Sequence, residues 1–149
     1  MGSEFERILK REPLLGDYGF CQWEGGDIRT VGRGLSMSAR RALSVVDITH
    51  DQEFQQNRES LATSEADFWR ATAWIGVNLE KSRKINQRRS AYGLKHIFEY
   101  ETGVYVTNGL FIAAMLHCGF SMERSGPNAL FNVREFSVKR FYRRGGLGW

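Results

Sequence analysis

The stretch of sequence that decides the fold is GLFIAAMLHC, residues 109–118. Apolar side chains occur all the way around a helix built on this stretch, and a helix without a polar face is normally buried. We therefore predict that residues 109–118 form the central core helix. Thr107 or Asn108 is expected to cap its beginning, and Gly119 is expected to end it.

A second helix is predicted just before it, from Ala91 to Thr102, with Ser90 as its N-cap and Gly103 as the left-handed residue that ends it. Joined by residues 103–106, the two helices have the outline of a DNA-binding helix-turn-helix. The second helix lacks the polar outer face that reading a DNA groove requires. We therefore favour two core helices packed as a helical hairpin.

The rest of the chain predicts more helices and one hairpin. The clearest helix covers residues 65–82, with a capping box of Ser64 and Asp67 at its start. Its apolar stripe consists of Phe68, Ala71, Ile75 and Leu79. Shorter helices are predicted at residues 4–11, capped by Ser3 and ended by Pro13, and at 36–46, 52–61 and 137–144.

Strand signals are limited to two places. Residues 18–31 predict a β-hairpin around Gly25 and Gly26, and residues 129–133 are a strand or a loop packed on the core. The fold class is thus predicted to be mainly α (α+β): a compact helical domain with a small N-terminal β-hairpin.

Composition narrows the class of protein. The chain has 149 residues, 42% of them hydrophobic, and two cysteines. These values predict a single domain, residues 1–149, in a reducing, cytoplasmic compartment. The longest uncharged apolar run, residues 110–118, is far shorter than the ~20 residues of a membrane-spanning helix, and no secretory signal is recognised near the start.

The two ends of the chain are treated separately. Residues 1–5 include Gly-Ser-Glu-Phe, which adjacent cloning sites commonly encode, so they are left out of the functional reasoning. Residues 145–149 are rich in glycine and are expected to form a flexible tail.

Charge is distributed unevenly along the chain. The formal net charge is +4, but residues 1–65 carry 8 basic and 11 acidic side chains, whereas residues 66–149 carry 13 basic and 6 acidic ones. A basic surface separated from an acidic one can orient a protein against a polyanion. The C-terminal half is therefore the expected place for a nucleic-acid contact.

The basic residues of that half form two clusters with aromatic residues among them. Cations bind phosphates without reading sequence, and aromatic rings stack on bases. The candidate nucleic-acid-binding residues are Arg83, Lys84, Arg88, Arg89, Tyr92, Lys139, Arg140, Arg143 and Arg144. The alternative is that the nearby Phe141 and Tyr142 belong to the core and that the arginines only keep the surface soluble.

Signals for catalysis are weaker. Asp47, His50, Asp51 and Glu53 lie close together and have side chains that hold metals or transfer protons. No second histidine stands at ligand spacing, and acidic residues at helix starts are ordinary caps. We predict no catalytic residue, no metal and no cofactor, and we interpret Cys118 as a core residue.

Three segments of the C-terminal half carry a resemblance. The sequences SAYGLKH at 90–96, YVTNGLFIAA at 105–114 and PNALFNV at 127–133 are similar to small uncharacterised proteins of phages, prophages and plasmids. The similarity covers about residues 85–140. It implies a mobile-element context, in which small accessory proteins handle nucleic acid or block host defence nucleases, and it brings no catalytic residues.

Two functional hypotheses follow. The first is a non-enzymatic mobile-element accessory protein that binds nucleic acid through its basic C-terminal half. The alternative is an anti-CRISPR-like inhibitor that docks on a host nuclease or nucleoprotein complex. In that case the acidic N-terminal half, including Asp17, Glu24 and Asp27, would imitate DNA charge or lie against a basic surface of the nuclease. Neither hypothesis involves a membrane, and the oligomeric state is open.

Overall fold

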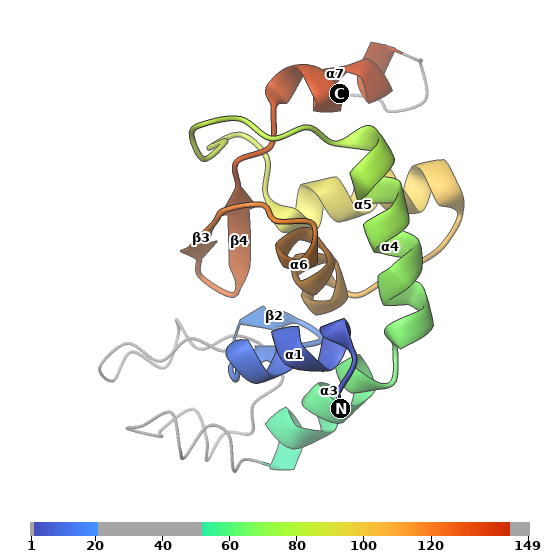
Figure 1. Cartoon of the computed structure of the whole chain (residues 1–149), viewed down its shortest axis with the longest axis vertical. Helices are drawn as coiled ribbons and strands as arrows, with labels where there is room; N and C mark the ends of the chain where they lie inside the picture. Colours follow the sequence, from blue (N-terminus) through green and yellow to red (C-terminus); the bar gives the residue numbers. More distant parts are fainter. Residues whose placement is uncertain (1, 21–51, 144–149) are drawn as a thin grey trace.

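The computed structural model describes residues 2–20 and 52–143 of the chain. The fold is mainly α, as predicted, and contains two small antiparallel hairpins, where one was predicted (Figure 1). The helices are α1 Glu4–Arg11, α3 Gln52–Ala62, α4 Glu65–Asn78, α5 Ala91–Thr102, α6 Asn108–His117 and α7 Glu135–Arg143. The strands are β1 Leu15–Gly16, β2 Gly19–Phe20, β3 Met122–Ser125 and β4 Asn128–Phe131.

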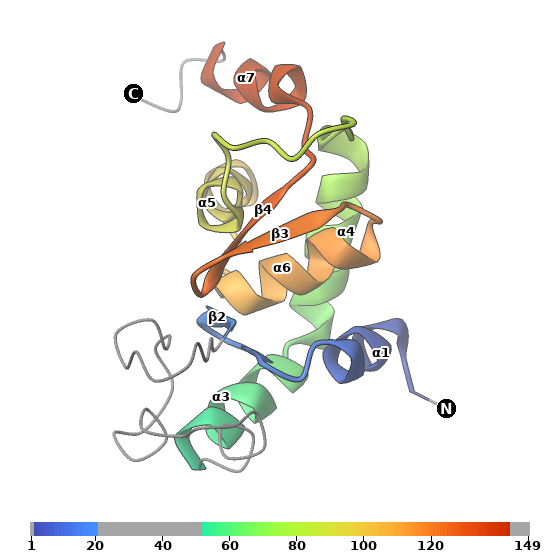
Figure 2. The same ribbon diagram turned by 90° about the vertical axis from the view of Figure 1, so that its left-hand side faces the viewer.

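Helix α6 lies at the centre of the molecule. Every residue from Gly109 to Met115 is buried, which confirms the prediction of a core helix. Helices α4 and α5 pack on it, and the β3–β4 hairpin covers another of its sides (Figures 1 and 2). A helix buried on all sides cannot enter a DNA groove, so α5 and α6 are not a DNA-reading helix-turn-helix.

Local capping explains why these helices begin and end where they do. Ser90 Oγ accepts the N–H of Gly93, Thr107 Oγ1 accepts that of Leu110, and Gly103 adopts a left-handed conformation with φ +73°. These caps are as predicted. The predicted capping box at Ser64 is wrong, because its side chain makes no cap and its hydroxyl donates to Ser60 O instead.

Helix α4 ends at Asn78, earlier than the predicted residue 82, because the chain after it pairs with a distant segment. Ser82 N donates to Asn132 O at 2.7 Å, and Asn86 N donates to Phe131 O at 2.9 Å. The buried side chain of Asn132 adds a bond from its Nδ2 to Ser82 O at 2.8 Å. Residues 79–90 therefore run beside β4 as an irregular segment, with a bend at 83–84 and a turn at 87–88.

The predicted strand or loop near residues 129–133 is strand β4, which pairs with β3, a strand that the sequence analysis did not predict. Helix α7 begins at Glu135, two residues before the predicted start. The predicted flexible tail at 145–149 lies outside the described residues.

Helix α1 belongs to the core. Phe5 is buried and stacks on Phe68 with ring centroids 4.5 Å apart, so this segment contributes to the fold. Arg58 of α3 donates to the carbonyl oxygens of Leu9, Glu12 and Leu15. Burial lowers the pKa of Arg58 below its usual value, and Glu12 partly opposes that change.

Two close backbone approaches hold the β1–β2 hairpin against the rest of the fold. Gly109 N donates to Asp17 O at 3.0 Å, and Phe20 N donates to Pro127 O at 2.8 Å. A Cβ atom at Gly109 would collide with Gly16 O, and one at Gly19 would collide with Pro127 O. The turn at Asp17 and Tyr18 is thereby fixed next to the start of α6.

This hairpin lies earlier in the chain than the hairpin predicted at residues 18–31, most of which lies outside the described residues. The predicted helix at 36–46 lies outside them too, whereas the predicted helix at 52–61 is confirmed as α3. None of the helices that the structure describes is long and apolar enough to cross a membrane.

Candidate nucleic-acid interface

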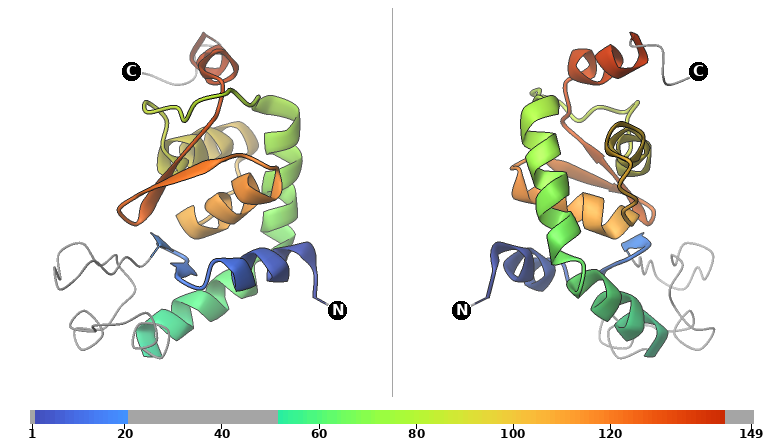
Figure 3. Two further views of the ribbon diagram at one scale, coloured as in Figure 1. Left: turned by 60° about the vertical axis from the view of Figure 1, so that its left-hand side comes forward. Right: turned by 90° about the vertical axis from the view of Figure 1, so that its right-hand side faces the viewer.

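Four of the predicted cations are exposed at one end of the molecule. Arg83, Lys84 and Arg88 lie in the bend and turn of segment 79–90, and Lys139 lies on α7, which packs above that segment (Figure 3). Within the described part of the chain, Arg83, Lys84 and Arg88 make no ion pair. We call these four residues the basic edge.

Two other predicted arginines form ion pairs or hydrogen bonds within the protein. Arg89 forms a bidentate ion pair with Glu135, with N–O distances of 2.9 and 2.8 Å, and donates to the Tyr142 hydroxyl at 3.0 Å. Arg140 donates to the carbonyl oxygens of Asn78 and Ser137. Both guanidinium groups help to hold α7 against the body of the protein, so a phosphate would compete with these contacts.

The Arg89 pair has a clear electrostatic signature. The hydrogen bonds from Arg89 lower the pKa of Glu135 from 4.5 to about 2, with a smaller contribution from Asn86 and from the charge of Lys139. The same hydrogen bonds raise the pKa of Arg89. Both groups are therefore charged at neutral pH.

The remaining predicted residues of α7 divide between the core and the undescribed end. Phe141 is 2% exposed and packs against Trp74, so it belongs to the core. Tyr142 is half-buried and stacks under Arg89, with 4.9 Å between the guanidinium carbon and the ring centroid. Arg143 ends α7, its side chain is not described, and Arg144 lies outside the described residues.

A cleft of about 470 Å³ opens beside the start of α5. The β1–β2 turn, the first turns of α5 and α6, the α5–α6 connection and the β3–β4 turn all contribute to it. Three exposed tyrosine rings surround it. We call it the tyrosine cleft, lined by Asp17, Tyr18, Tyr92, Lys95, Tyr105 and Asn108.

Lys95 forms one wall of this cleft although it is only 3% exposed. Its Nζ lies 5.0 Å from the centre of the Tyr92 ring and 5.1 Å from that of Tyr105, and it is paired with Glu99 at 3.1 Å. Cation–π contacts of this kind hold both rings against the ammonium group. The charge of Lys95 is met by Glu99 within the protein.

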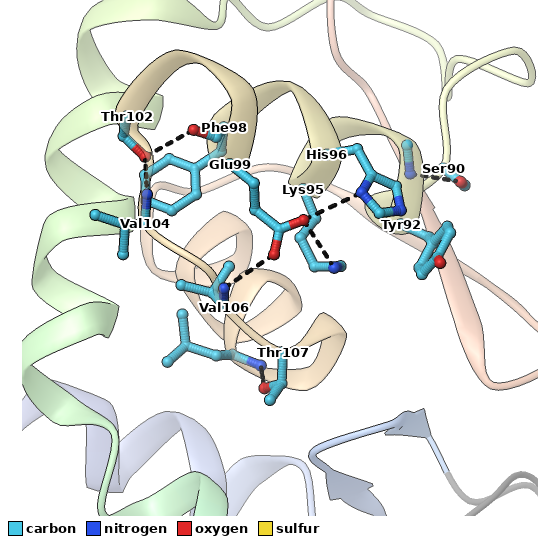
Figure 4. A network of polar contacts seen from close by, with 12 residues as sticks. Ser90, Tyr92, Lys95, His96, Phe98, Glu99, Thr102, Val104, Val106 and Thr107 are labelled. Atoms are coloured by element: carbon cyan, nitrogen blue, oxygen red, sulfur yellow. Dashed lines mark hydrogen bonds and ion pairs between the residues drawn. The ribbon is translucent and has the colours of Figure 1, made fainter.

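Glu99 fixes the position of Tyr105 as well as that of Lys95. Figure 4 shows its carboxylate between Lys95, His96 and the α5–α6 connection, where Glu99 Oε2 accepts the N–H of Val106 at 3.1 Å. Val104 N donates to Thr102 Oγ1, also at 3.1 Å. Because both neighbours of Tyr105 are bonded to α5, its backbone is held in place while its ring stays 76% exposed.

Asn128 joins three walls of the cleft. Its Oδ1 accepts the N–H groups of Tyr92 at 3.3 Å and Ala129 at 2.9 Å, and also accepts the Asn108 amide Nδ2 at 3.3 Å. Two oxygens beside this junction, Asp17 Oδ1 and Asn108 Oδ1, are buried and have no hydrogen-bond partner among the described residues. Buried polar atoms are nearly always paired, so an unpaired one indicates a strained site or a missing partner.

Of the cleft residues, the sequence analysis predicted only Tyr92. It missed Tyr18, Lys95, Tyr105 and Asn108, and named Asp17 only for the alternative hypothesis, because these residues come from separate segments. One signal was present: Tyr92, Lys95 and Glu99 stand three and four positions apart, which places them on one face of α5.

The chain shows no match in comparisons with models of protein families, with curated proteins or with solved structures. Its function must therefore be argued from the basic edge and the tyrosine cleft.

Other predicted sites do not add to these two surfaces. The described residues contain no group of three side chains that could hold a metal ion. The acidic group at residues 47–53 falls outside the described side chains. Cys118 is half-buried at the end of α6, its thiol lies 3.6 Å from Thr72 O, and burial raises its pKa.

The acidic surface of the alternative hypothesis is described only in part. Glu24 and Asp27 lie outside the described residues, and Asp17 lines the tyrosine cleft. No observation on the described residues therefore favours an imitation of DNA charge over a direct contact with nucleic acid.

Proposed function

We propose that the protein binds single-stranded nucleic acid, with phosphates along the basic edge and one unstacked base in the tyrosine cleft. Proteins that bind single strands combine cations that follow the backbone with aromatic rings on which bases stack. The observation that carries the proposal is that three exposed tyrosines border a cleft at one end of β4, while exposed cations with no ion pair among the described residues lie at its other end.

Strand β4 connects the two surfaces. At one of its ends, Asn128 bonds to Tyr92 in the cleft; at the other, Phe131 O accepts a bond from Asn86 in the basic segment. A strand rises about 3.3 Å per residue, so these two points are about 10 Å apart. One extended nucleic-acid strand could therefore contact both surfaces.

This proposal keeps the expected role of a non-enzymatic accessory protein and narrows the site. The basic edge replaces the full set of predicted cations, because Arg89 and Arg140 are used by the fold. The residues proposed to stack on bases are now Tyr18, Tyr92 and Tyr105. The mobile-element context stays a prediction from the resemblance.

The test compares two triple charge reversals by fluorescence anisotropy with a labelled single-stranded oligonucleotide at low salt. One variant changes Arg83, Lys84 and Arg88 to Glu. The control changes Arg7, Lys10 and Arg11 to Glu; these are exposed on α1 at the other end of the molecule (Figure 3). Both variants alter net charge equally; the control also removes the exposed Arg7–Glu4 ion pair, which contributes little.

We expect the first variant to lose about a hundredfold in affinity, since it removes three phosphate contacts, and the control to lose less than about threefold. An equal loss in both variants would mean that net charge alone drives binding and would overturn the proposal. So would a wild-type protein that binds no oligonucleotide.

A further inference from the structure

From the unpaired oxygens of Asp17 and Asn108, we infer that the tyrosine cleft selects a nucleobase that carries an exocyclic amino group. It would accept cytosine, adenine or guanine in preference to thymine or uracil. The inference deepens the proposed function and rests on it.

The orientation of the Asn108 amide is determined by its neighbour. Asn128 Oδ1 already accepts backbone N–H groups from Tyr92 and Ala129, so the Asn108 atom that faces it at 3.3 Å must be the Nδ2 donor. The Asn108 Oδ1 atom is therefore an acceptor, and it is buried without a partner.

The second acceptor, Asp17 Oδ1, is held beside it. The backbone oxygen of Asp17 accepts the N–H of Gly109 at 3.0 Å, which fixes Asp17 at the N-terminus of α6. The positive end of the helix dipole stabilises a carboxylate there. A ligand that brings N–H groups to these two oxygens would satisfy both of them.

A phosphate does not fit this place. The N–H groups of Gly93 and Leu110 are bonded to their helix caps, and that of Gly109 is bonded to Asp17. The ammonium group of Lys95 is paired with Glu99. The charge of Lys95 is thus already balanced within the protein, and the two unpaired acceptors would repel an anion.

Aromatic rings provide the remaining contact surface for the base, and the movement of one ring gives the base access to the two oxygens. Tyr18 is 52% exposed, so its side chain changes rotamer at little cost in packing, whereas the rings of Tyr92 and Tyr105 are held by Lys95. Asp17 and Asn108 line the same cleft as these rings, so a base that stacks there would reach their oxygens once the Tyr18 side chain moves. Thymine and uracil carry a carbonyl oxygen where cytosine and adenine carry the amino group, and two facing acceptors repel each other.

The experiment measures binding of labelled oligo-dC and oligo-dT, each about 12 nucleotides long, to the full chain by fluorescence anisotropy. It uses the wild type, Asp17→Ala, Asn108→Ala and the surface control Asp67→Ala. We expect the wild type and the control to bind oligo-dC about tenfold more tightly than oligo-dT. In the two cleft variants the ratio should fall to about two or less, through loss of oligo-dC binding.

Retained oligo-dT binding shows that each variant is folded, so the ratio does not depend on stability. Asp17→Asn, which keeps an acceptor but removes the charge, should give an intermediate ratio. Equal binding of the two oligonucleotides by the wild type, or a ratio that the cleft variants leave unchanged, would overturn the inference. The proposed function would survive that result, and only the absence of binding to both oligonucleotides, or equal loss in the two charge-reversal variants, would end it.

Discussion

The basic edge and the tyrosine cleft differ in how much of their chemistry the fold leaves available. The basic edge comes from residues clustered along the sequence, but Arg89 and Arg140, from the same clusters, are bonded to Glu135 and to backbone carbonyls. The cleft comes from five separate segments and presents two buried oxygens with no partner among the described residues.

This difference shows that the number of basic residues clustered in a sequence is larger than the number that a ligand can bind. An arginine beside a carboxylate partner on another element holds the fold together, whereas a polar group that lacks such a partner remains available for binding. The following predictions separate the two kinds of residue, beginning with the largest effect.

The largest expected effect comes from disrupting the close backbone contact between Gly109 and Gly16, which brings the β1–β2 turn next to α6. Gly109→Ala places a Cβ atom against Gly16 O, which forces the β1–β2 hairpin away from α6 and should cost about 3 kcal/mol of stability. Gly76→Ala is the control, because nothing lies within 4 Å of its added Cβ. Alanine within a helix should stabilise that variant by about 0.5–1 kcal/mol. Urea unfolding measures both, and a loss in Gly109→Ala no greater than about 0.5 kcal/mol would contradict the close packing.

The basic segment itself offers a second test through two adjacent arginines. Arg89→Met removes the bidentate pair with Glu135 and the contact with Tyr142, so we expect a loss of about 2 kcal/mol in the free energy of unfolding. Arg88→Met should change stability by less than about 0.5 kcal/mol, because its side chain is exposed. When both variants are folded, Arg88→Met should weaken oligonucleotide binding more than Arg89→Met does. Equal stabilities would show that the Arg89 pair contributes nothing.

Much of this fold could be predicted from sequence because its signals are local. The all-apolar residues 109–118, the caps Ser90 and Thr107 and the left-handed Gly103 are each decided within a few residues of chain. The end of α4 could not be found in this way. Its continuation beyond Asn78 is prevented by hydrogen bonds from residues 80–86 to β4 and its neighbours, which are about 50 positions away.

The contrast between local signals and contacts of distant segments also explains which parts of the site could be predicted. The cations were found because they are adjacent in sequence, but their partition between fold and surface depends on Glu135 and Asn78, which lie on other elements. The cleft depends on Asp17, Asn108 and Asn128 meeting at one point. No pattern within one segment predicts that meeting.

The third prediction concerns base stacking in the cleft. Tyr105→Ala should weaken oligonucleotide binding about tenfold, since removing one stacking ring typically costs ~1–3 kcal/mol. Tyr100→Ala is the matched control, because Tyr100 is also exposed but does not line the cleft. Truncating either exposed ring should leave thermal unfolding nearly unchanged, so a difference in anisotropy reports on the ligand. Identical affinities of the two variants would remove Tyr105 from the interface.

The smallest expected effect is the pH dependence of the Arg89–Glu135 pair. The pKa of Glu135 is about 2 in the folded protein, against an ordinary value of 4.5. Below pH 4.5 the unfolded chain binds a proton that the folded protein does not, so this contribution to stability is fully present above pH 4.5 and is lost as the pH falls toward 2. Glu135 is partly exposed to water, which limits the contribution to about 1 kcal/mol. Glu135→Gln should therefore be less stable than the wild type at pH 7 and approach it in acid, as followed by urea unfolding. A difference that stays constant from pH 7 to pH 2.5 would assign the effect of Glu135 to packing rather than to charge, and Arg89 would then count among the cations available to a ligand.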